Sequence, residues 1–112
     1  MKMNTQSQLL KGTLEGCVLK VIADSETYGY EISEKLKADG FQNISEGTIY
    51  PLLLRLEKNA LITAVYRDSP LGPKRKYYSI TQTGTAFLKD FLRNWHSLQK
   101  SVNRLFSGSE EE

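Results

Sequence analysis

A short run of cations in the second half of the chain has the chemistry to bind phosphate. Lys74, Arg75 and Lys76 follow one another without an intervening acid. Such a run neutralises phosphate charge and adds affinity for nucleic acid without reading base sequence. The alternative is a solvated loop tip that has no partner.

A second group of residues offers hydroxyl groups near the start of a leucine-rich segment. Ser45, Thr48 and Tyr50 precede Leu52 and its neighbours. Helix N-termini and short hydroxyl side chains suit phosphate oxygens, and the same residues can reach base edges. We therefore expect Ser45, Thr48 and Tyr50 to contact DNA together with the cationic run. Otherwise Ser45 or Thr48 only caps a helix and Tyr50 packs on its neighbours.

The chain carries no known arrangement for catalysis or metal binding. Its one histidine, His96, and its one cysteine, Cys17, are far apart in the sequence. The P-loop, the dinucleotide glycine fingerprint, paired cysteines and the zinc-protease motif are all absent. We expect no enzyme activity, no metal site and no cofactor, and we interpret Cys17 as a small core residue.

The length of 112 residues fits about one domain. The formal net charge is only +2, but residues 41–80 hold six Lys/Arg against three Asp/Glu. The excess positive charge therefore surrounds the candidate phosphate contacts. A single cysteine excludes an intrachain disulfide. No apolar stretch approaches the roughly 20 residues of a membrane span, so we expect a cytoplasmic protein with no membrane partner.

Two helices are expected ahead of the hydroxyl-bearing residues. Apolar residues at steps of three and four predict an amphipathic helix over 8–23. Gly12 and Gly16 lie four apart in it, which indicates either the close approach of another backbone or two tolerated glycines. Thr27 is the expected cap of a second helix, and Gly40 is placed to end that helix in a left-handed conformation.

The leucine-rich segment predicts a third helix and the following residues predict a hairpin. The helix start is open between Ser45 and Thr48, because Pro51 disfavours a helix interior. Segments 61–67 and 76–80 are rich in β-forming residues. The turn residues between them predict a long tip that carries the cationic run.

A final helix is expected from a cap at Thr81 to about residue 106. Its apolar residues follow a heptad pattern. They are Leu88, Phe91, Trp95, Leu98, Val102 and Leu105. A helix of about 25 residues spans about 37 Å, more than the small preceding domain can cover. We expect a second copy of the chain to cover this stripe; the alternative is a helix folded back over its own domain.

The order of these elements defines the expected fold class, mainly α with a small β-hairpin. It is a winged helix-turn-helix plus a long C-terminal dimerisation helix. The second helix of the pair can enter the DNA major groove while the basic wing follows phosphates. We divide the chain into a flexible arm over 1–7, a DNA-binding domain over 8–80, the dimerisation helix over 81–106 and an acidic tail over 107–112.

Four segments of the chain resemble the PadR family of transcriptional regulators, in particular its small, multidrug-sensing members. They are QLLKGTLE at 8–15, YGYEI at 28–32, GTIYPLLLRLEKNALI at 47–62 and GPKRKYYSITQTG at 72–84. The family places a proline where Pro51 stands. The chain departs from the pattern at Asn59-Ala60, where the family often has glycine, and we expect a local change of the turn there.

The resemblance implies a homodimeric repressor of a palindromic operator in double-stranded DNA, with an interface built from the first and last helices. In this chain that interface adds Leu10 and Leu14 to the stripe. Family members often release DNA when a drug or phenolic compound binds. The resemblance makes Trp95 the candidate contact for a flat aromatic ligand, with Phe91, Leu14 and Val18 beside it. Otherwise Trp95 is an ordinary residue of the dimer core.

Two other function classes remain as alternatives. One is a winged-helix module that acts in protein–protein association, and the other is a small-molecule-binding dimer with little DNA binding. Loss of the basic wing residues would favour the first alternative, and those residues are present.

Overall fold

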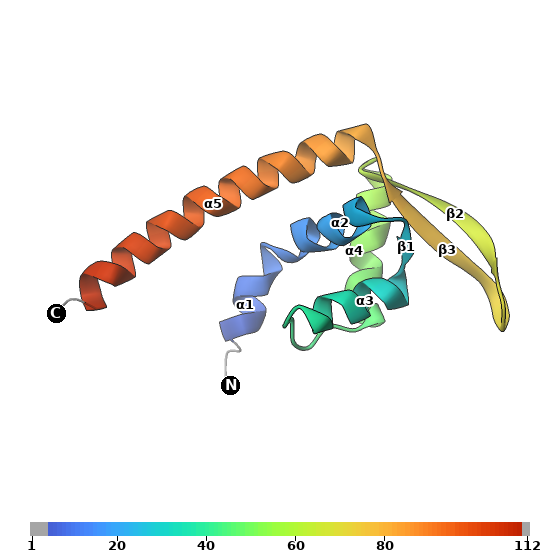
Figure 1. The fold of residues 1–112 in the computed structure, drawn as a ribbon, viewed down its shortest axis with the longest axis horizontal. Coiled ribbons are helices and arrows are strands. Elements are labelled where there is room, and N and C mark those ends of the chain that lie inside the picture. Colours follow the sequence, from blue (N-terminus) through green and yellow to red (C-terminus); the bar gives the residue numbers. More distant parts are fainter. Residues whose placement is uncertain (1–4, 111–112) are drawn as a thin grey trace.

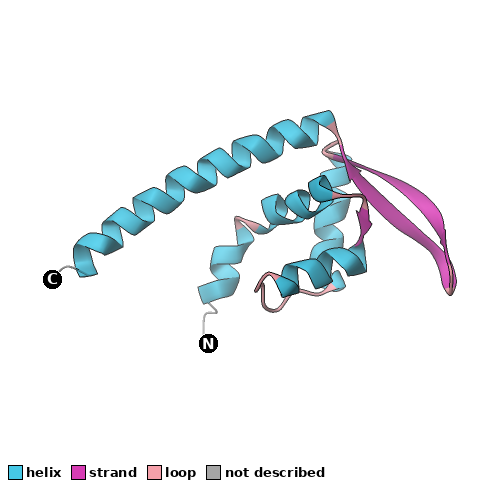
Figure 2. Ribbon diagram, viewed as in Figure 1, coloured by secondary structure: helices cyan, strands magenta, loops and turns pink. Residues whose placement is uncertain are grey.

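The computed structural model describes residues 5–110, which form helices and three strands. The elements are α1 (Thr5–Lys11), α2 (Leu14–Asp24), β1 (Thr27–Tyr28), α3 (Gly29–Ala38), α4 (Glu46–Lys58), β2 (Ile62–Ser69), β3 (Gly72–Ile80) and α5 (Gln82–Glu110). Helices α2, α3 and α4 lie together, the strands project at one end, and α5 extends away from the hairpin (Figure 1). Figure 2 shows how small the strand content is beside the helices. The expected fold class is confirmed.

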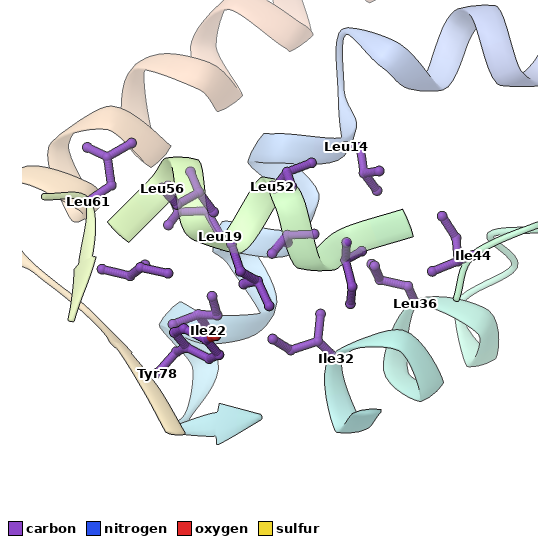
Figure 3. Close-up of a cluster of buried hydrophobic side chains, with 14 residues drawn as sticks. Leu14, Leu19, Ile22, Ile32, Leu36, Ile44, Leu52, Leu56, Leu61 and Tyr78 are labelled. Carbon is purple, nitrogen blue, oxygen red and sulfur yellow. The ribbon is translucent and has the colours of Figure 1, made fainter. Parts of the chain in front are cut away.

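Apolar side chains from α2, α3, α4 and the sheet form one core (Figure 3). Its members are Leu14, Val18, Leu19, Ile22, Ile32, Leu36, Ile44, Ile49, Leu52, Leu53, Leu56, Leu61, Ile62 and Tyr78. Steps of three and four place the α2 and α4 members on one side of each helix. The core therefore fixes α3 and α4 relative to the base of the hairpin.

The expected single helix over 8–23 is in fact two helices, α1 and α2, which meet at Thr13. The Thr13 N–H donates to the Leu10 carbonyl oxygen at 3.0 Å, and the Thr13 hydroxyl donates to the same oxygen at 3.3 Å. These bonds span three residues and interrupt the helical pattern of four. Helix α1 begins at Thr5, inside the expected flexible arm, whereas residues 1–4 lie outside the described residues.

Thr27 does not cap α3, contrary to the expectation. Thr27 and Tyr28 form β1, which pairs antiparallel with Tyr78 and Tyr77 of β3. Thr27 is buried, and its hydroxyl donates to Glu31 Oε1 at 2.6 Å. The hairpin thus belongs to a three-stranded sheet of order β1-β3-β2. A two-residue edge strand has no periodic pattern of its own that the sequence could reveal.

Helix α3 ends as expected at a left-handed glycine. Gly40 has φ of 101°. The N–H groups of Gly40 and Phe41 donate to the carbonyl oxygens of Lys37 and Leu36, each at 3.0 Å. This pair of bonds is the Schellman motif, which satisfies carbonyl groups at a helix C-terminus.

Helix α4 ends in the same motif with an alanine in the glycine position. The N–H groups of Ala60 and Leu61 donate to the carbonyl oxygens of Glu57 and Leu56, each at 3.0 Å. Ala60 has φ of 61°, a region that L-residues with a Cβ rarely adopt. The departure from glycine therefore leaves the turn in place and puts an alanine under strain.

Ser45 is the N-cap of α4 and fixes the start that the sequence left open. Its Oγ accepts from the Thr48 N–H at 3.3 Å and lies 3.1 Å from Thr48 Oγ1. Pro51 consequently lies inside the helix, where it lacks the N–H that would bond to the Gly47 carbonyl. Buried residues before and after Pro51 hold the helix to the core across this missing bond.

The hairpin is longer than expected and its tip is shorter. The paired strands continue as far as Ser69 and Gly72. Only Pro70 and Leu71 lie between the strands, so the expected long tip over 68–75 is wrong. The cationic run lies within β3. Pairing along the ladder draws residues of low strand propensity into the sheet, because strand formation depends on context more than on residue type.

Thr81 caps α5, as expected. Its Oγ1 accepts from the Gly84 N–H at 2.9 Å and donates to the Ala60 carbonyl oxygen at 2.7 Å. Gly84 is buried, and a Cβ there would overlap the Leu61 carbonyl oxygen. The start of α5 is therefore pressed against the turn that links α4 to β2.

Helix α5 runs to Glu110, beyond the expected end near residue 106. Part of the expected acidic tail is thus helical, and residues 111–112 lie outside the described residues. The Cα radius of gyration is 16.5 Å, against about 13 Å for a compact chain of this length. The excess follows from the C-terminal half of α5, which projects beyond the other elements (Figure 1).

The first half of α5 packs on α2 at Phe91 and Gly16. The Phe91 ring covers Gly16 so closely that a Cβ there would overlap it. Close approach therefore explains Gly16, although the approaching group is an aromatic ring rather than a backbone. A Cβ at Gly12 would meet none of residues 5–110 within 4 Å, so Gly12 is a tolerated glycine within this part of the chain.

Candidate nucleic-acid interface

The two faces of α4 differ in what they contact. The buried face consists of Ile49, Leu52, Leu53 and Leu56. Tyr50 and Leu54 lie on the opposite face and are 53% and 47% exposed. A helix held from behind by the core, with one face open beside a hairpin, is suited to the major groove of DNA.

The three predicted hydroxyl contacts, Ser45, Thr48 and Tyr50, lie together at the start of α4, and all are exposed. Ser45 caps α4, which is the structural role that the alternative interpretation had assigned to Ser45 or Thr48. Its capping position and the free N–H groups of the first turn also make this end of α4 suited to a phosphate oxygen. Contact of these residues with DNA stays a prediction.

Arg55 lies at the edge of the open face and turns toward α2. Its Nη2 atom is 3.5 Å from Glu15 Oε2. Both side chains are partly exposed, so the pair contributes little stability. It does draw the only arginine of α4 away from the centre of the open face.

Strand geometry divides the cationic run between the two faces of the sheet. Side chains alternate along a strand, so Lys74 and Lys76 share one face and Arg75 lies on the other. In the ladder, Lys76 pairs with Tyr66 and Arg75 pairs with Arg67. The three cations therefore cannot act as one cluster, as the prediction of a loop tip had implied.

Lys76 is engaged within the protein. Its Nζ lies 2.8 Å from Glu57 Oε1 and 5.6 Å from the centroid of the Tyr78 ring. The hydrogen bond to Glu57 raises the pKa of Lys76 above its ordinary value, against a smaller effect of burial. Lys76 thus ties β3 to the end of α4 with its charge balanced. Of the three predicted wing contacts it is the least suited to neutralise a phosphate.

Arg75 is held on the outer face of the sheet by two tyrosines. Its Cζ lies 4.5 Å from the centroid of the Tyr28 ring, and the Tyr28 and Tyr77 rings are 5.2 Å apart. A hydrogen bond to Tyr77 raises the pKa of Arg75. The cation–π contact orients the guanidinium without neutralising it. Arg75 and the exposed Lys74 are therefore the cations of the run that remain available to DNA.

Two exposed residues of this surface, Tyr66 and Leu54, were not predicted from the sequence. Tyr66 is 66% exposed and shares the sheet face of Lys76, which points to α4. The alternation of Tyr66 with Ala64 and Ile62 is a usable signal, but only once the strand is known to continue to the tip. Leu54 was hidden among leucines that are buried.

The predicted stripe of α5 divides into two parts. Leu88 and Phe91 are half-buried against their own domain. Beyond them the stripe is uncovered, and Trp95 is 38% exposed. The exposed large apolar residues of α5 are Phe87, Leu92, Trp95, Leu98, Val102, Leu105 and Phe106. A long apolar surface thus has no cover among residues 5–110.

The residues predicted to accompany Trp95 at a ligand site have different surroundings. Val18 has no exposed surface and Leu14 has almost none, because both belong to the core of their own chain. The expectation that Val18 lines an open site is therefore corrected. Phe91 and Leu10 are half-buried and retain some surface for a partner or ligand.

Groups suited to other chemistry are not assembled here. Within residues 5–110, no cluster of His, Cys, Asp and Glu could hold a metal ion. No helix among these residues is long and apolar enough to cross a membrane. Cys17 is half-buried, and burial raises the pKa of its thiol, which disfavours the reactive thiolate.

A packed helix pair with one open face, followed by a hairpin that presents cations, defines the class of winged helix-turn-helix DNA-binding proteins. Residues 18–90 match the family model described as the transcriptional regulator PadR-like family. The chain therefore belongs to the PadR-like family. Its members are transcriptional regulators that bind DNA and are not enzymes.

Individual relatives agree with this assignment. A PadR-like transcriptional regulator from Bacillus cereus is 52% identical with a TM-score of 0.80, covering 88% of this chain and 96% of its own. A Streptococcus transcriptional regulator is 48% identical with a TM-score of 0.78, and the same shares are covered. A transcriptional regulator of Mycobacterium tuberculosis is 33% identical over 85 residues, 76% of this chain and 78% of that protein.

Proposed function

We propose that this protein is a cytoplasmic homodimeric repressor that binds a palindromic operator and releases it when a small aromatic ligand binds between the two last helices. The observation that carries the proposal is the uncovered apolar stripe of α5 attached to a winged helix-turn-helix domain. The stripe supports a two-fold dimer, and a two-fold dimer presents two copies of α4 to a two-fold symmetric site.

The dimer is supported by the size and spacing of the stripe. From Phe91 to Glu110, α5 continues for about 28 Å. Its apolar residues recur at steps of three and four, the spacing at which two helices interlock side chains. An exposed apolar surface of this extent is unfavourable in water, and an equivalent stripe on a second copy covers both.

A single charge in the stripe tests the dimer. Leu98→Glu places a carboxylate on the apolar face, and we expect light scattering after size-exclusion chromatography to report a monomer mass. The matched control is Ser97→Glu, one residue away and outside the stripe, which keeps the mass of the parent protein. A Leu98→Glu protein with the parent mass contradicts the proposed interface.

DNA binding is tested by gel shift with the region upstream of the protein's own gene. We expect binding at low salt, weaker binding of the full palindrome by the Leu98→Glu monomer, and fragments with one half-site bound about equally by both. Loss of the second half-site removes the gain from linking two contacts. Absence of binding by the parent protein at low salt would favour the alternative, a winged-helix dimer that acts in small-molecule binding or protein–protein association.

The ligand part of the proposal rests on Trp95, which is 38% exposed at the start of the uncovered part of the stripe. An aromatic ring there offers a stacking surface to a flat ligand, as in the multidrug-sensing members. We expect rhodamine 6G, a flat cationic dye, or a phenolic acid to quench Trp95 fluorescence and weaken the gel shift. The Trp95→Leu protein keeps its dimer mass, and its gel shift no longer weakens when either compound is added. If neither compound moves either signal, Trp95 is an ordinary dimer-core residue.

A further inference from the structure

The open face of α4 is apolar at its centre. Tyr50 and Leu54 lie one turn apart on this face, and Pro51 is exposed beside them. Gly47 lies one turn before Pro51, so the four residues form a continuous patch over two turns. The centre of the surface that a winged helix-turn-helix domain turns to bases thus consists of the Tyr50 ring, the aliphatic groups of Pro51 and Leu54 and the bare backbone at Gly47, with the exposed Thr48 at its N-terminal edge.

Side chains that can make two hydrogen bonds to one base are scarce on this face. Arginine on guanine, and asparagine or glutamine on adenine, make the usual two-bond contacts in the major groove. Helix α4 contains no asparagine or glutamine. Its one arginine, Arg55, turns to Glu15 at 3.5 Å. Lys58 stands at the C-terminal end of this face, one turn after Leu54, whereas the Glu46 carboxylate lies beside Gly29 at the start of α3.

Gly47 adds an independent indication that something approaches α4 closely. A glycine in a helix costs up to about 1 kcal/mol relative to alanine. Among the described residues, a Cβ at Gly47 would meet only Ser45 Oγ, at the ordinary contact distance of 3.7 Å. The fold of the chain therefore does not require a glycine here. Close approach of a partner to the helix backbone would explain the glycine at this position.

We infer that α4 reads thymine methyl groups: Tyr50, Pro51 and Leu54 pack on the C5-methyl groups of thymines in each half-site, and Gly47 lets the helix lie against the base edges. Among groups in the major groove, the thymine methyl is the apolar one. The inference rests on the proposed DNA binding and adds which bases are read and by which residues.

The first test selects bound duplexes from a random library with the full-length protein. We expect half-sites with A·T pairs at the positions that face α4. Each thymine in the selected half-sites is then replaced by deoxyuridine, which removes only the methyl group. We expect affinity to fall about fourfold for each contacted methyl, the effect of exposing one such group to water. Deoxyuridine outside the half-sites is the control and leaves affinity unchanged.

The second test links the methyl groups to the residues. Leu54→Ala is expected to weaken binding of the thymine site and to shrink the deoxyuridine penalty, whereas Val65→Ala keeps both. Val65 is a matched control because it is also 47% exposed but lies on the sheet face opposite Lys76. Gly47→Ala is expected to fold normally and to lose about tenfold in affinity, since its new methyl group projects from the helix toward the bases.

The outcomes separate this inference from the proposed function. Specific binding with G·C-rich half-sites, or with no deoxyuridine penalty, overturns the methyl reading and leaves DNA binding intact. An equal deoxyuridine penalty in the parent, Leu54→Ala and Val65→Ala proteins overturns the residue assignment. Failure to select any duplex overturns the proposed function and this inference with it.

Discussion

The end of α4 offers a test of backbone strain with an internal control. Ala60 and Gly40 occupy the same position in two Schellman motifs with the same pattern of 3.0 Å bonds. One position is an alanine at φ of 61° and the other a glycine at φ of 101°. The substitutions Ala60→Gly and Gly40→Ala therefore exchange the two residue types in one kind of turn.

The magnitude follows from two opposing effects. The left-handed conformation costs an L-residue about 1–2 kcal/mol. Replacing alanine by glycine also destabilises the folded state by about 0.4–1 kcal/mol, because glycine raises the conformational entropy of the unfolded chain. Ala60→Gly should therefore raise the free energy of unfolding by about 0.5–1 kcal/mol per protomer. Gly40→Ala should lower the same quantity by at least a similar amount, since its new Cβ would contact none of the residues that the structure describes.

The assay is urea unfolding followed by circular dichroism, at one fixed protein concentration because the stability of the proposed dimer would depend on concentration. Thermal unfolding should move in the same direction, by about 4 °C for each substitution. DNA affinity should not change. If Ala60→Gly and Gly40→Ala both lower the free energy of unfolding, the strain argument is refuted. Backbone conformation would then not determine whether a substitution stabilises or destabilises the protein.

Three further outcomes are expected. Lys74→Ala combined with Arg75→Ala should weaken DNA binding and reduce the slope of log affinity against log salt by about 0.9 for each phosphate that the wing no longer neutralises; an unchanged slope removes the wing from the interface. Gly16→Val should lower stability and detach α5 from α2, and adding Phe91→Ala should restore part of the stability, as unfolding curves of the single and double variants will report. Cys17 should react with iodoacetamide more slowly than a free cysteine at pH 8, because its raised pKa keeps the thiol protonated; reaction at the rate of free cysteine contradicts its burial.

Local signals in the sequence identified the caps at Thr81 and Gly40 and offered Ser45 as one of two starts for α4. Ser45, Thr81 and Gly40 each act within a few residues of their own position, so residue type and spacing are sufficient to identify them. Thr27 was wrongly predicted to be a cap because a long-range contact determines its conformation. It has the composition of a cap, but pairing with β3, a segment about fifty residues away in the sequence, decides its conformation.

The site was predicted in part. The sequence pointed to α4 and to the cations of the hairpin, because charge and hydroxyl groups are visible in one dimension. It did not show that Lys76 pairs with Glu57 while Arg75 stacks on Tyr28. Those two partners come from two other elements, α4 and β1, and the alternation of a strand that was expected to be a loop sends neighbouring cations to opposite faces.

The sequence by itself determined the types of the longer elements, the family and the apolar stripe of α5, since periodicity and short motifs are local properties. Only the tertiary structure decided how much of that stripe is free. Phe91 packs against Gly16 of its own chain, whereas Trp95 and the later apolar residues of the stripe are exposed. Tertiary packing also decided which face of α4 is open, because a leucine-rich helix has more apolar residues than one core can bury, and Leu54 is the one left facing outward.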